Sequence, residues 1–282
     1  MTPVGPALPL SRVRALRTVV YAFVLVDVLL VSNDVLGYAG SAAYYRPLLL
    51  ARLLHLPPVT APMAWALLAA TVGGCLLALA GRAPRAAGAV VGISFGLWML
   101  YSNGYGYVAH DHLPLMVAVW VLPTVPAARW REDTPDEAAG WAILAIRLAV
   151  VATYALSVLS KVEYSGSPAA WANSAILAWA FLRRGSILAQ WLLEVPWLLI
   201  PAQWAALAME VLSPVVLFLR GRVLYAAIGV FLLFHLTTLL TLGIHFLPVV
   251  VCWAAFLPLE RVRDTRLVRR LRQWPVLRSL PV

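Results

Sequence analysis

The run "RLAVVATYALSVLSKVEYSGSPAAW", residues 147–171, is the stretch that most clearly indicates the fold class. It holds an apolar stretch of helix length that starts at Arg147 and reaches Lys161, the only lysine in the 282-residue sequence. An apolar helix of about 20 residues crosses the ~30 Å hydrocarbon layer of a bilayer. The run therefore predicts a membrane-spanning helix that carries a few polar groups.

The composition extends this prediction to the whole chain. Hydrophobic residues make up 62% and charged residues 12%, with a mean hydropathy of +0.85. A soluble domain is nearer half apolar and a quarter charged. The alternating segments of an outer-membrane barrel are too few. We therefore expect an all-α, polytopic membrane helix bundle with about eight transmembrane helices. The expected spans are residues 16–36, 60–80, 86–102, 108–125, 139–161, 198–219, 223–243 and 245–259.

The net charge of +10 could indicate a nucleic-acid partner, but the arginines stand at the ends of the apolar runs. We therefore expect the lipid bilayer, and not nucleic acid, as the partner. The positive-inside rule then predicts a multi-pass cell-membrane protein with both termini in the cytoplasm. Residues 1–260 would form the transmembrane domain, and residues 261–282 a basic cytoplasmic tail on anionic lipid. The longest outside connection, about 162–197, holds Trp-rich amphipathic pieces suited to the membrane interface.

Four ionisable residues fall at comparable depth on four of the expected spans. Buried charges are costly in a membrane and usually face the bundle interior. We therefore expect a mutually satisfied network in which the arginine bonds at least one carboxylate. Two interpretations stay open: a network that locks the bundle, or a path for a proton or ligand. The four residues are Asp27, Arg147, Glu210 and His235.

The helix that reaches Lys161 carries a polar stripe. Arg147, Tyr154 and Lys161 are spaced by seven, with Ser157 between the last two. Positions seven apart drift only ~20° around a helix, so the stripe would line an interior groove that rises toward the outer face. The mouth of this groove would hold three histidines near the ends of neighbouring spans, namely His110, His112 and His245.

Each of these features has a simpler interpretation. A lysine at the end of a span is often an interfacial anchor. The sequence His110-Asp111-His112 resembles a metal cluster, but side chains at i and i+2 of a helix point apart, so we expect no metal. Cys75 and Cys252 fall inside apolar spans and read as small core residues.

Four stretches resemble the HTTM (horizontally transferred transmembrane) family, which is related to the vitamin K-dependent γ-carboxylase. "YALSVLSKVEYSGSPAAW" is similar to that family's Tyr…Gly-Leu-Ser-Lys-Leu…Trp stretch, and "AHDHLPLMVAVW" resembles its Asn-His-X-Tyr-Leu segment. "LAMEVLSPVVLFLR" resembles its Glu…Pro pattern, and "FHLTTLLTLGIHFLPVVVCWAAFLP" its His-Leu…Leu-Gly…Leu-Pro ending. The four stretches come in the family's order and cover roughly residues 15–260.

The resemblance implies an enzyme-like role for Lys161. The carboxylase uses a lysine here to deprotonate vitamin K hydroquinone, and oxygenation then yields an epoxide and a strong base. Lys161 would be the catalytic base toward a quinol-like lipid, and His110 would hydrogen-bond the quinol oxygen. An amine can serve as a base, whereas a guanidinium stays protonated. We expect no carboxylate near enough to hold the proton of Lys161. The residues expected to contact substrate are Tyr154, Ser157, His112 and His245.

The sequence also departs from the family pattern. Ser160 replaces the first lysine of the carboxylase pair, Ala109 replaces the Asn, and the insertion "SGSPAA" displaces the Trp. Two function classes follow. One is a membrane enzyme that acts on a quinol-like lipid or a secreted peptide, with Lys161 as base. The other is a non-catalytic membrane protein for peptide maturation, immunity or lipid binding. The insertion and the lack of a large extramembrane segment favour this second class, whereas the sole lysine on a polar stripe favours the enzyme, which we take as the first expectation.

Overall fold

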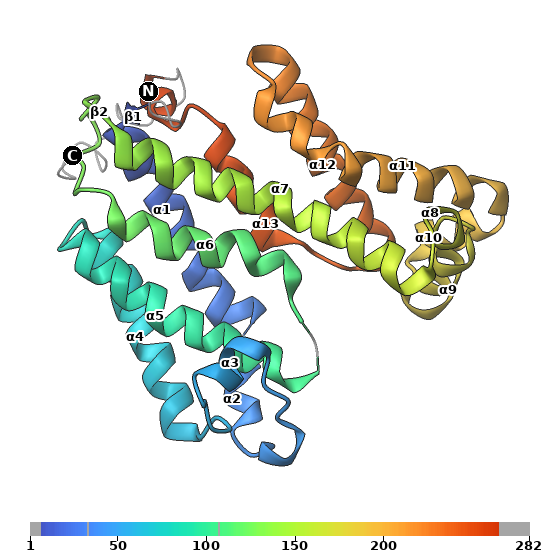
Figure 1. Ribbon diagram of the computed structural model, residues 1–282, viewed down its shortest axis with the longest axis horizontal. Helices are drawn as coiled ribbons and strands as arrows, with labels where there is room; N and C mark the ends of the chain where they lie inside the picture. The colour runs from blue at the N-terminus through green and yellow to red at the C-terminus, as the bar shows by residue number, and fades with distance from the viewer. Residues whose placement is uncertain (1–6, 33, 107, 265–282) are drawn as a thin grey trace. The chain divides into compact units, whose positions relative to one another are not determined.

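The computed structural model describes residues 7–32, 34–106 and 108–264, and within them the regular structure is almost wholly helical (Figure 1). The predicted all-α class is confirmed. The only strands described are Leu8–Pro9 (β1) and Pro135–Asp136 (β2), which pair antiparallel with Leu8 opposite Asp136. Most of the predicted basic tail, residues 265–282, lies outside the described residues.

The α-helices differ greatly in length. Short 3₁₀ turns connect several of them, and a π-helical turn, Asp27–Val31, continues the first helix. The helices are α1 Leu10–Val26, α2 Val35–Tyr38, α3 Leu49–Leu53, α4 Ala61–Leu79, α5 Pro84–Ser102, α6 Leu113–Val121, α7 Glu137–Ser165, α8 Pro168–Trp171, α9 Ala175–Arg184, α10 Ile187–Leu193, α11 Leu199–Val211, α12 Gly221–Leu242 and α13 Leu247–Cys252.

The chain divides into two compact units. The first contains the described residues up to Arg147 together with those from Val251 onward, and the second is Leu148–Val250. The single long helix α7 contributes its first part to one unit and its last part to the other.

Four described helical segments are long and apolar enough to cross a membrane. They are Ala61–Leu79, Pro84–Tyr105, Glu137–Ser165 and Gly221–Leu242. A fifth candidate is the pair Ile187–Leu193 and Pro196–Val211, which is bent by 99°. Many large apolar side chains of these helices are exposed, for example Leu233 at 62%, and lipid would cover such surfaces. The chain is therefore a membrane protein.

The predicted number of eight spans is not supported. The expected spans 16–36, 108–125, 198–219 and 245–259 contain shorter helices. Their apolar runs are long enough to cross a membrane, but the α-helices end inside them. The helix α1 passes into a π-helical turn at Asp27. After α6 and α11 the chain enters 3₁₀ turns whose second residue is a proline. Proline lacks the amide hydrogen that an α-helix needs in its interior. Hydropathy measures the length of an apolar run and misses these breaks.

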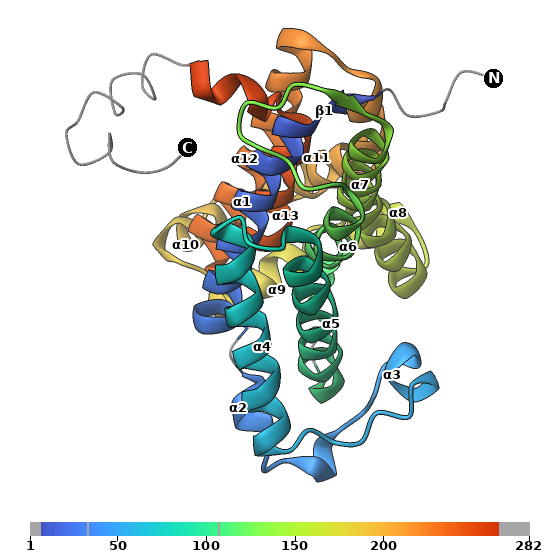
Figure 2. The same ribbon diagram turned by 90° about the vertical axis from the view of Figure 1, so that its left-hand side faces the viewer.

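Within the first unit, α4, α5 and α6 pack closely, and α4 runs beside α5 (Figure 2). Glycines on α5 allow the close approach of α6, as small residues do between membrane helices. A Cβ on Gly88 would lie 2.9 Å from Pro123, and one on Gly92 would lie 3.1 Å from Trp120. The indole of Trp120 donates a hydrogen bond to the Gly92 carbonyl at 2.7 Å. These contacts fix α6 against α5.

Arg17 stabilises the fold directly. The sequence prediction used it only as a signal of membrane orientation. Arg17 is 1% exposed, and its guanidinium donates to three carbonyls at the end of the 3₁₀ turn that follows α6. Carbonyls at a helix end lack the full set of helical partners. The Leu122 carbonyl also accepts from the Val125 amide at 3.3 Å, and the guanidinium caps the turn Leu122–Thr124 and the segment after it. The three acceptors are Leu122 at 2.6 Å, Val125 at 2.6 Å and Pro126 at 3.0 Å.

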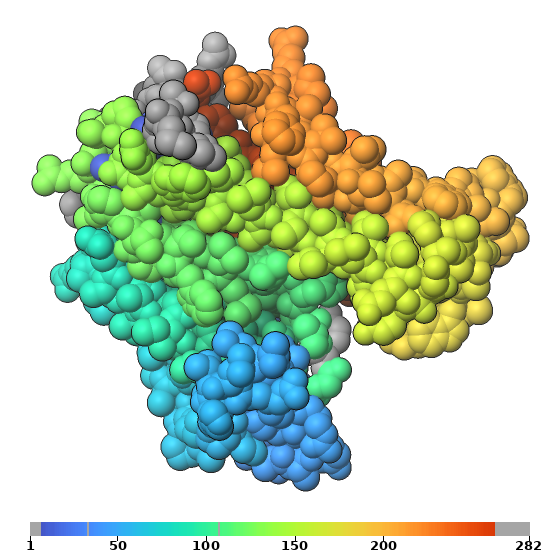
Figure 3. All heavy atoms as spheres, in the orientation of Figure 1, coloured from blue at the N-terminus to red at the C-terminus, as the bar shows by residue number. Residues whose placement is uncertain are grey.

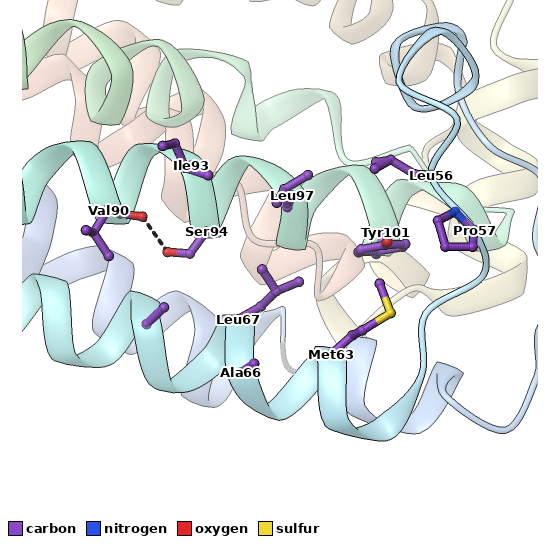
Figure 4. A pocket seen from close by; sticks show the side chains of 11 residues that line it. Leu56, Pro57, Met63, Ala66, Leu67, Val90, Ile93, Ser94, Leu97 and Tyr101 are labelled. Carbon is purple, nitrogen blue, oxygen red and sulfur yellow. Dashed lines mark hydrogen bonds between the residues drawn. The ribbon is translucent and has the colours of Figure 1, made fainter.

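An apolar groove of about 530 Å³ lies between α4 and α5. Met63 and Leu67 of α4 face Leu97 and Tyr101 of α5 across it, and Leu56 lies near one end (Figure 4). The short helices α2 and α3 pack against α5, and the space-filling view shows the blue atoms of this segment beside the cyan atoms of the helices that follow (Figure 3). Among the residues that the structure describes, no charged side chain lines this groove.

The second unit packs α9, α10 and α12 together around a small core of Phe181, Ala189 and Leu199. The α12 helix ends at Leu242 because Gly243 adopts a φ of +65°, a left-handed conformation that favours glycine. Backbone bonding also ties α10 to α12, since the Ser186 amide donates to the Thr241 carbonyl at 2.8 Å.

Candidate functional site

The polar stripe on α7 meets polar groups from two other helices of the second unit. Tyr154, Ser157 and Lys161 reach Glu210 of α11 and His235 of α12. On a helix, positions three, four and seven apart share a face, so one side of α7 presents a phenol, a hydroxyl and an ammonium. The structure therefore gathers these side chains into one cluster.

Lys161 and Glu210 form an ion pair between Nζ and Oε2. The Glu210 side chain is 5% exposed and that of Lys161 is 20% exposed. The Ser157 hydroxyl also approaches the second carboxylate oxygen of Glu210, at 3.5 Å. The expectation that no carboxylate lies near Lys161 is therefore wrong. Depth along the spans gave no information on how α11 is rotated toward α7.

An aromatic ring covers the ammonium. Lys161 Nζ lies 4.7 Å from the centre of the Trp171 ring, a cation–π arrangement. Trp171 ends α8, and this short helix is formed by the inserted sequence that displaces the Trp from the family pattern. Ser167 caps α8 by accepting from the Ala170 amide at 3.1 Å. The insertion thus forms a turn that returns the Trp to the lysine.

Gln203 holds this turn in place. Its Nε2 donates to the Trp171 carbonyl at 2.9 Å, and its Oε1 accepts from the Ser174 amide at 2.7 Å. Sequence reasoning missed Gln203, although a signal existed. Gln203, Leu207 and Glu210 are spaced by four and three, so on a helix they share one face. This spacing places Gln203 on the same face as the Glu210 carboxylate, and the structure shows that all three residues are buried.

Tyr154 and His235 form the inner end of the cluster. The phenol oxygen lies 2.7 Å from His235 Nε2, and both side chains are buried. Aromatic rings surround them: Phe231 lies 4.7 Å from the Tyr154 ring, and Phe246 lies 5.1 Å from the imidazole, between ring centres. A phenol–imidazole pair in apolar surroundings can hold or pass a proton.

A second buried polar cluster lies in the first unit. Nε2 of His112 is 3.1 Å from Asp27 and its Nδ1 is 3.1 Å from Asp111. Ser32 donates to the other oxygen of Asp27 at 2.7 Å, and Trp98 donates to the Ser32 carbonyl at 2.7 Å. Asp27 begins the π-helical turn, a distortion that often marks functional positions. Asp111 is itself buried, at 6% exposed.

The predicted four-residue network is not observed as one group. Asp27 bonds His112, whereas Arg147 makes no ion pair among the described residues. The Arg147 guanidinium donates to the Ala255 carbonyl at 3.0 Å and lies over the Phe256 ring at 5.3 Å. Equal depth in a membrane does not imply the same face, so residues at one level can bond different partners.

The three predicted mouth histidines differ in environment. His110 and His245 are exposed, whereas His112 is buried between carboxylates. His110 belongs to the first unit and Lys161 to the second, so their cooperation stays a prediction. In the part of the chain that the structure describes, no three His, Cys, Asp or Glu side chains could together hold a metal ion.

Comparisons with protein-family models, curated proteins and solved structures give no match to this chain. The resemblance to the HTTM family therefore stays a prediction that rests on the four sequence stretches.

Proposed function

We propose that this chain is a membrane-embedded enzyme that removes a proton from the hydroxyl of a quinol-like lipid at the Lys161–Glu210 pair. The observation that carries the proposal is the pair itself, with the Trp171 ring over the ammonium. The order of the HTTM-like stretches supports the same chemistry. The proposal places the protein in the cell membrane with both termini in the cytoplasm, as the arginine distribution predicts.

The residues fit a flat, hydroxyl-bearing ligand. Trp171 offers an aromatic face, Ser157 a hydroxyl, and Lys161 a donor or acceptor, all within one cluster. A bound hydroquinone would supply an acidic phenolic hydroxyl. Tyr154 and His235 would extend the polar surface inward and fix the orientation of the ligand.

The ion pair can supply the base without adding net charge to the site. Lys161 passes an ammonium proton to the Glu210 carboxylate and becomes a neutral amine. The amine then takes the proton of the ligand hydroxyl and is an ammonium again. A proton has moved from the ligand to Glu210, and the ammonium pairs with the new anion. Because the net charge is unchanged, the apolar surroundings oppose the transfer less than they would oppose an unpaired charge.

The test is spectroscopic and anaerobic. The purified chain in detergent is titrated with a naphthohydroquinone, and ultraviolet difference spectra report formation of the phenolate. We expect a phenolate signal with the parent chain at a pH where the free quinol stays protonated. Lys161→Arg should abolish the signal, since the guanidinium cannot accept the proton. Arg184→Gln, an exposed arginine of the same unit, should leave it unchanged. A parent chain without any phenolate signal would exclude this function.

The ion pair also favours a second candidate function. A lysine held by a buried carboxylate can simply lock α7 to α11, as in a non-catalytic protein for peptide maturation, immunity or lipid binding. Lys161→Arg would then retain the ion pair and the biological activity. The same variant therefore separates the two candidates, because only the enzyme loses function when charge is kept and titration is lost.

A further inference from the structure

A second groove lies in the first unit, between α5 and the segment formed by α6 and the turn after it. Its volume is about 570 Å³, inside the range of about 300–1,000 Å³ typical of ligand pockets. Its walls are mostly apolar and include Ala89, Ile93, Val119 and Trp120. One end carries Arg85.

The groove is hollow because α5 presents small residues there. Ala86, Ala89 and Gly92 leave space that larger side chains would fill. Trp120 forms the facing wall, and its indole is fixed by the hydrogen bond to the Gly92 carbonyl. Half of the Trp120 surface is exposed (50%), although its ring is held in place. An apolar ligand would contact this exposed surface.

Arg85 is exposed and has no carboxylate partner among the residues that the structure describes. It stands in the first turn of α5, which begins the candidate membrane span Pro84–Tyr105. The end of a span lies at the level of the lipid headgroups. An exposed guanidinium at that level attracts phosphate, with which it forms bidentate hydrogen bonds.

We propose that this groove binds one anionic phospholipid, with an acyl chain along Ala89 and Trp120 and the phosphate on Arg85. The charge at one end and the apolar walls beyond it match the two parts of such a lipid. Basic pockets between membrane helices recognise anionic headgroups in this way. The α4–α5 groove offers a comparison within the same unit, because it has a similar volume and no charged residue.

The binding experiment uses Trp120 as the reporter. The purified full chain in detergent micelles is titrated with phosphatidylglycerol or phosphatidylcholine that carries brominated acyl chains, which quench tryptophan emission on contact. The difference between the parent and Trp120→Phe isolates the reporter. We expect half-saturation at about fivefold less phosphatidylglycerol than phosphatidylcholine, the effect of one basic side chain near an anionic lipid.

Matched variants test the two halves of the site. Arg85→Gln should remove the preference for the anionic lipid, whereas Arg82→Gln should keep it, since Arg82 is exposed nearby in the sequence but does not line the groove. Ala89→Leu should reduce Trp120 quenching by both lipids, and Ala66→Leu in the α4–α5 groove should not. Circular dichroism and gel filtration confirm that the variants are folded.

Three results would overturn the proposal. The first is equal quenching of the parent by the two lipids, which would mean that the headgroup is not recognised. The second is an equal effect of Arg82→Gln and Arg85→Gln, which would show a diffuse surface charge. The third is unchanged quenching in Ala89→Leu, which would place the lipid chain outside the groove.

Discussion

Asp27 and His112, 85 residues apart in the chain, are joined by a contact of 3.1 Å between Oδ1 and Nε2. Asp27 is fully buried (0% exposed) and His112 is 4% exposed. The other imidazole nitrogen faces Asp111, so the ring lies between two carboxylates. This cluster connects the end of α1 to the turn before α6.

We predict that His112→Leu lowers the free energy of unfolding by about 3–5 kcal/mol, the cost of leaving buried charges without their partner. His245→Gln is the matched control, since His245 is exposed, and it should change the value by less than about 0.5 kcal/mol. Titration with a denaturing detergent, followed by circular dichroism, measures both. Equal stability of the two variants would mean that the buried cluster does not hold α1 to the α6 turn.

The Lys161–Glu210 pair gives a prediction about coupling. Lys161→Met and Glu210→Gln should each destabilise the chain by about 1–3 kcal/mol, less than for a fully buried pair because Lys161 is 20% exposed. The double variant should lose less than the sum of the two single losses, since neither charge is then left without its partner. A double-mutant cycle on the unfolding free energy measures this coupling.

Glu194→Gln is the control for that cycle, because Glu194 is an exposed carboxylate of the same unit. Combined with Lys161→Met, it should give simple additivity. Additive losses for Lys161 and Glu210 themselves would show that the ion pair contributes no interaction free energy to the fold.

The all-α class and the membrane character could be predicted from the sequence, because apolar length and composition determine them. The polar face of α7 could also be predicted, since Tyr154, Ser157 and Lys161 follow helical spacing. Their partners could not, because the rotation of α11 and α12 depends on packing between helices. For the same reason the expected bond between Arg147 and at least one carboxylate of the network is not observed: Asp27 contacts His112, and Arg147 donates to the Ala255 carbonyl.

The breaks in the helices were harder to predict. The π-helical turn at Asp27 follows an uninterrupted apolar run, and apart from Asp27 its residues are apolar like those directly before it. Arg17 shows the same limit. The positive-inside pattern treats every arginine at a helix end as an orientation signal, and only the structure shows that this one is buried and caps carbonyls.

Arg17 leads to a third prediction. Arg17→Gln should lower the unfolding free energy by about 2–4 kcal/mol, because several carbonyls at a buried helix end lose a charged donor. Arg17→Lys should recover only part of the loss, since a single ammonium cannot reproduce the planar fork of the guanidinium. Thermal unfolding in detergent measures both variants. Arg82→Gln, which changes an exposed arginine, should leave the midpoint unchanged. Full recovery by lysine would show that charge alone, and not geometry, is needed.

The last prediction concerns pH. Arg12 donates two hydrogen bonds to the Glu260 carboxylate, from Nε to Oε2 at 2.7 Å and from Nη2 to Oε1 at 2.5 Å. Partial burial alone would raise the pKa of Glu260, but the hydrogen bonds from Arg12 outweigh it and hold that pKa below its usual value.

A carboxyl whose pKa is lowered by folding stabilises the folded state above its unfolded pKa, and this stabilisation is lost as the pH falls through the folded value. Glu260→Gln should therefore be less stable than the parent by about 0.5–1 kcal/mol at neutral pH. The difference should shrink as the pH falls below about 4.3, the usual pKa of a glutamate, and vanish below the lowered pKa of Glu260. Unfolding free energies of the two chains across this acid range measure the effect. A difference that persists unchanged at the lowest pH would mean that Glu260 acts through packing and not through its charge.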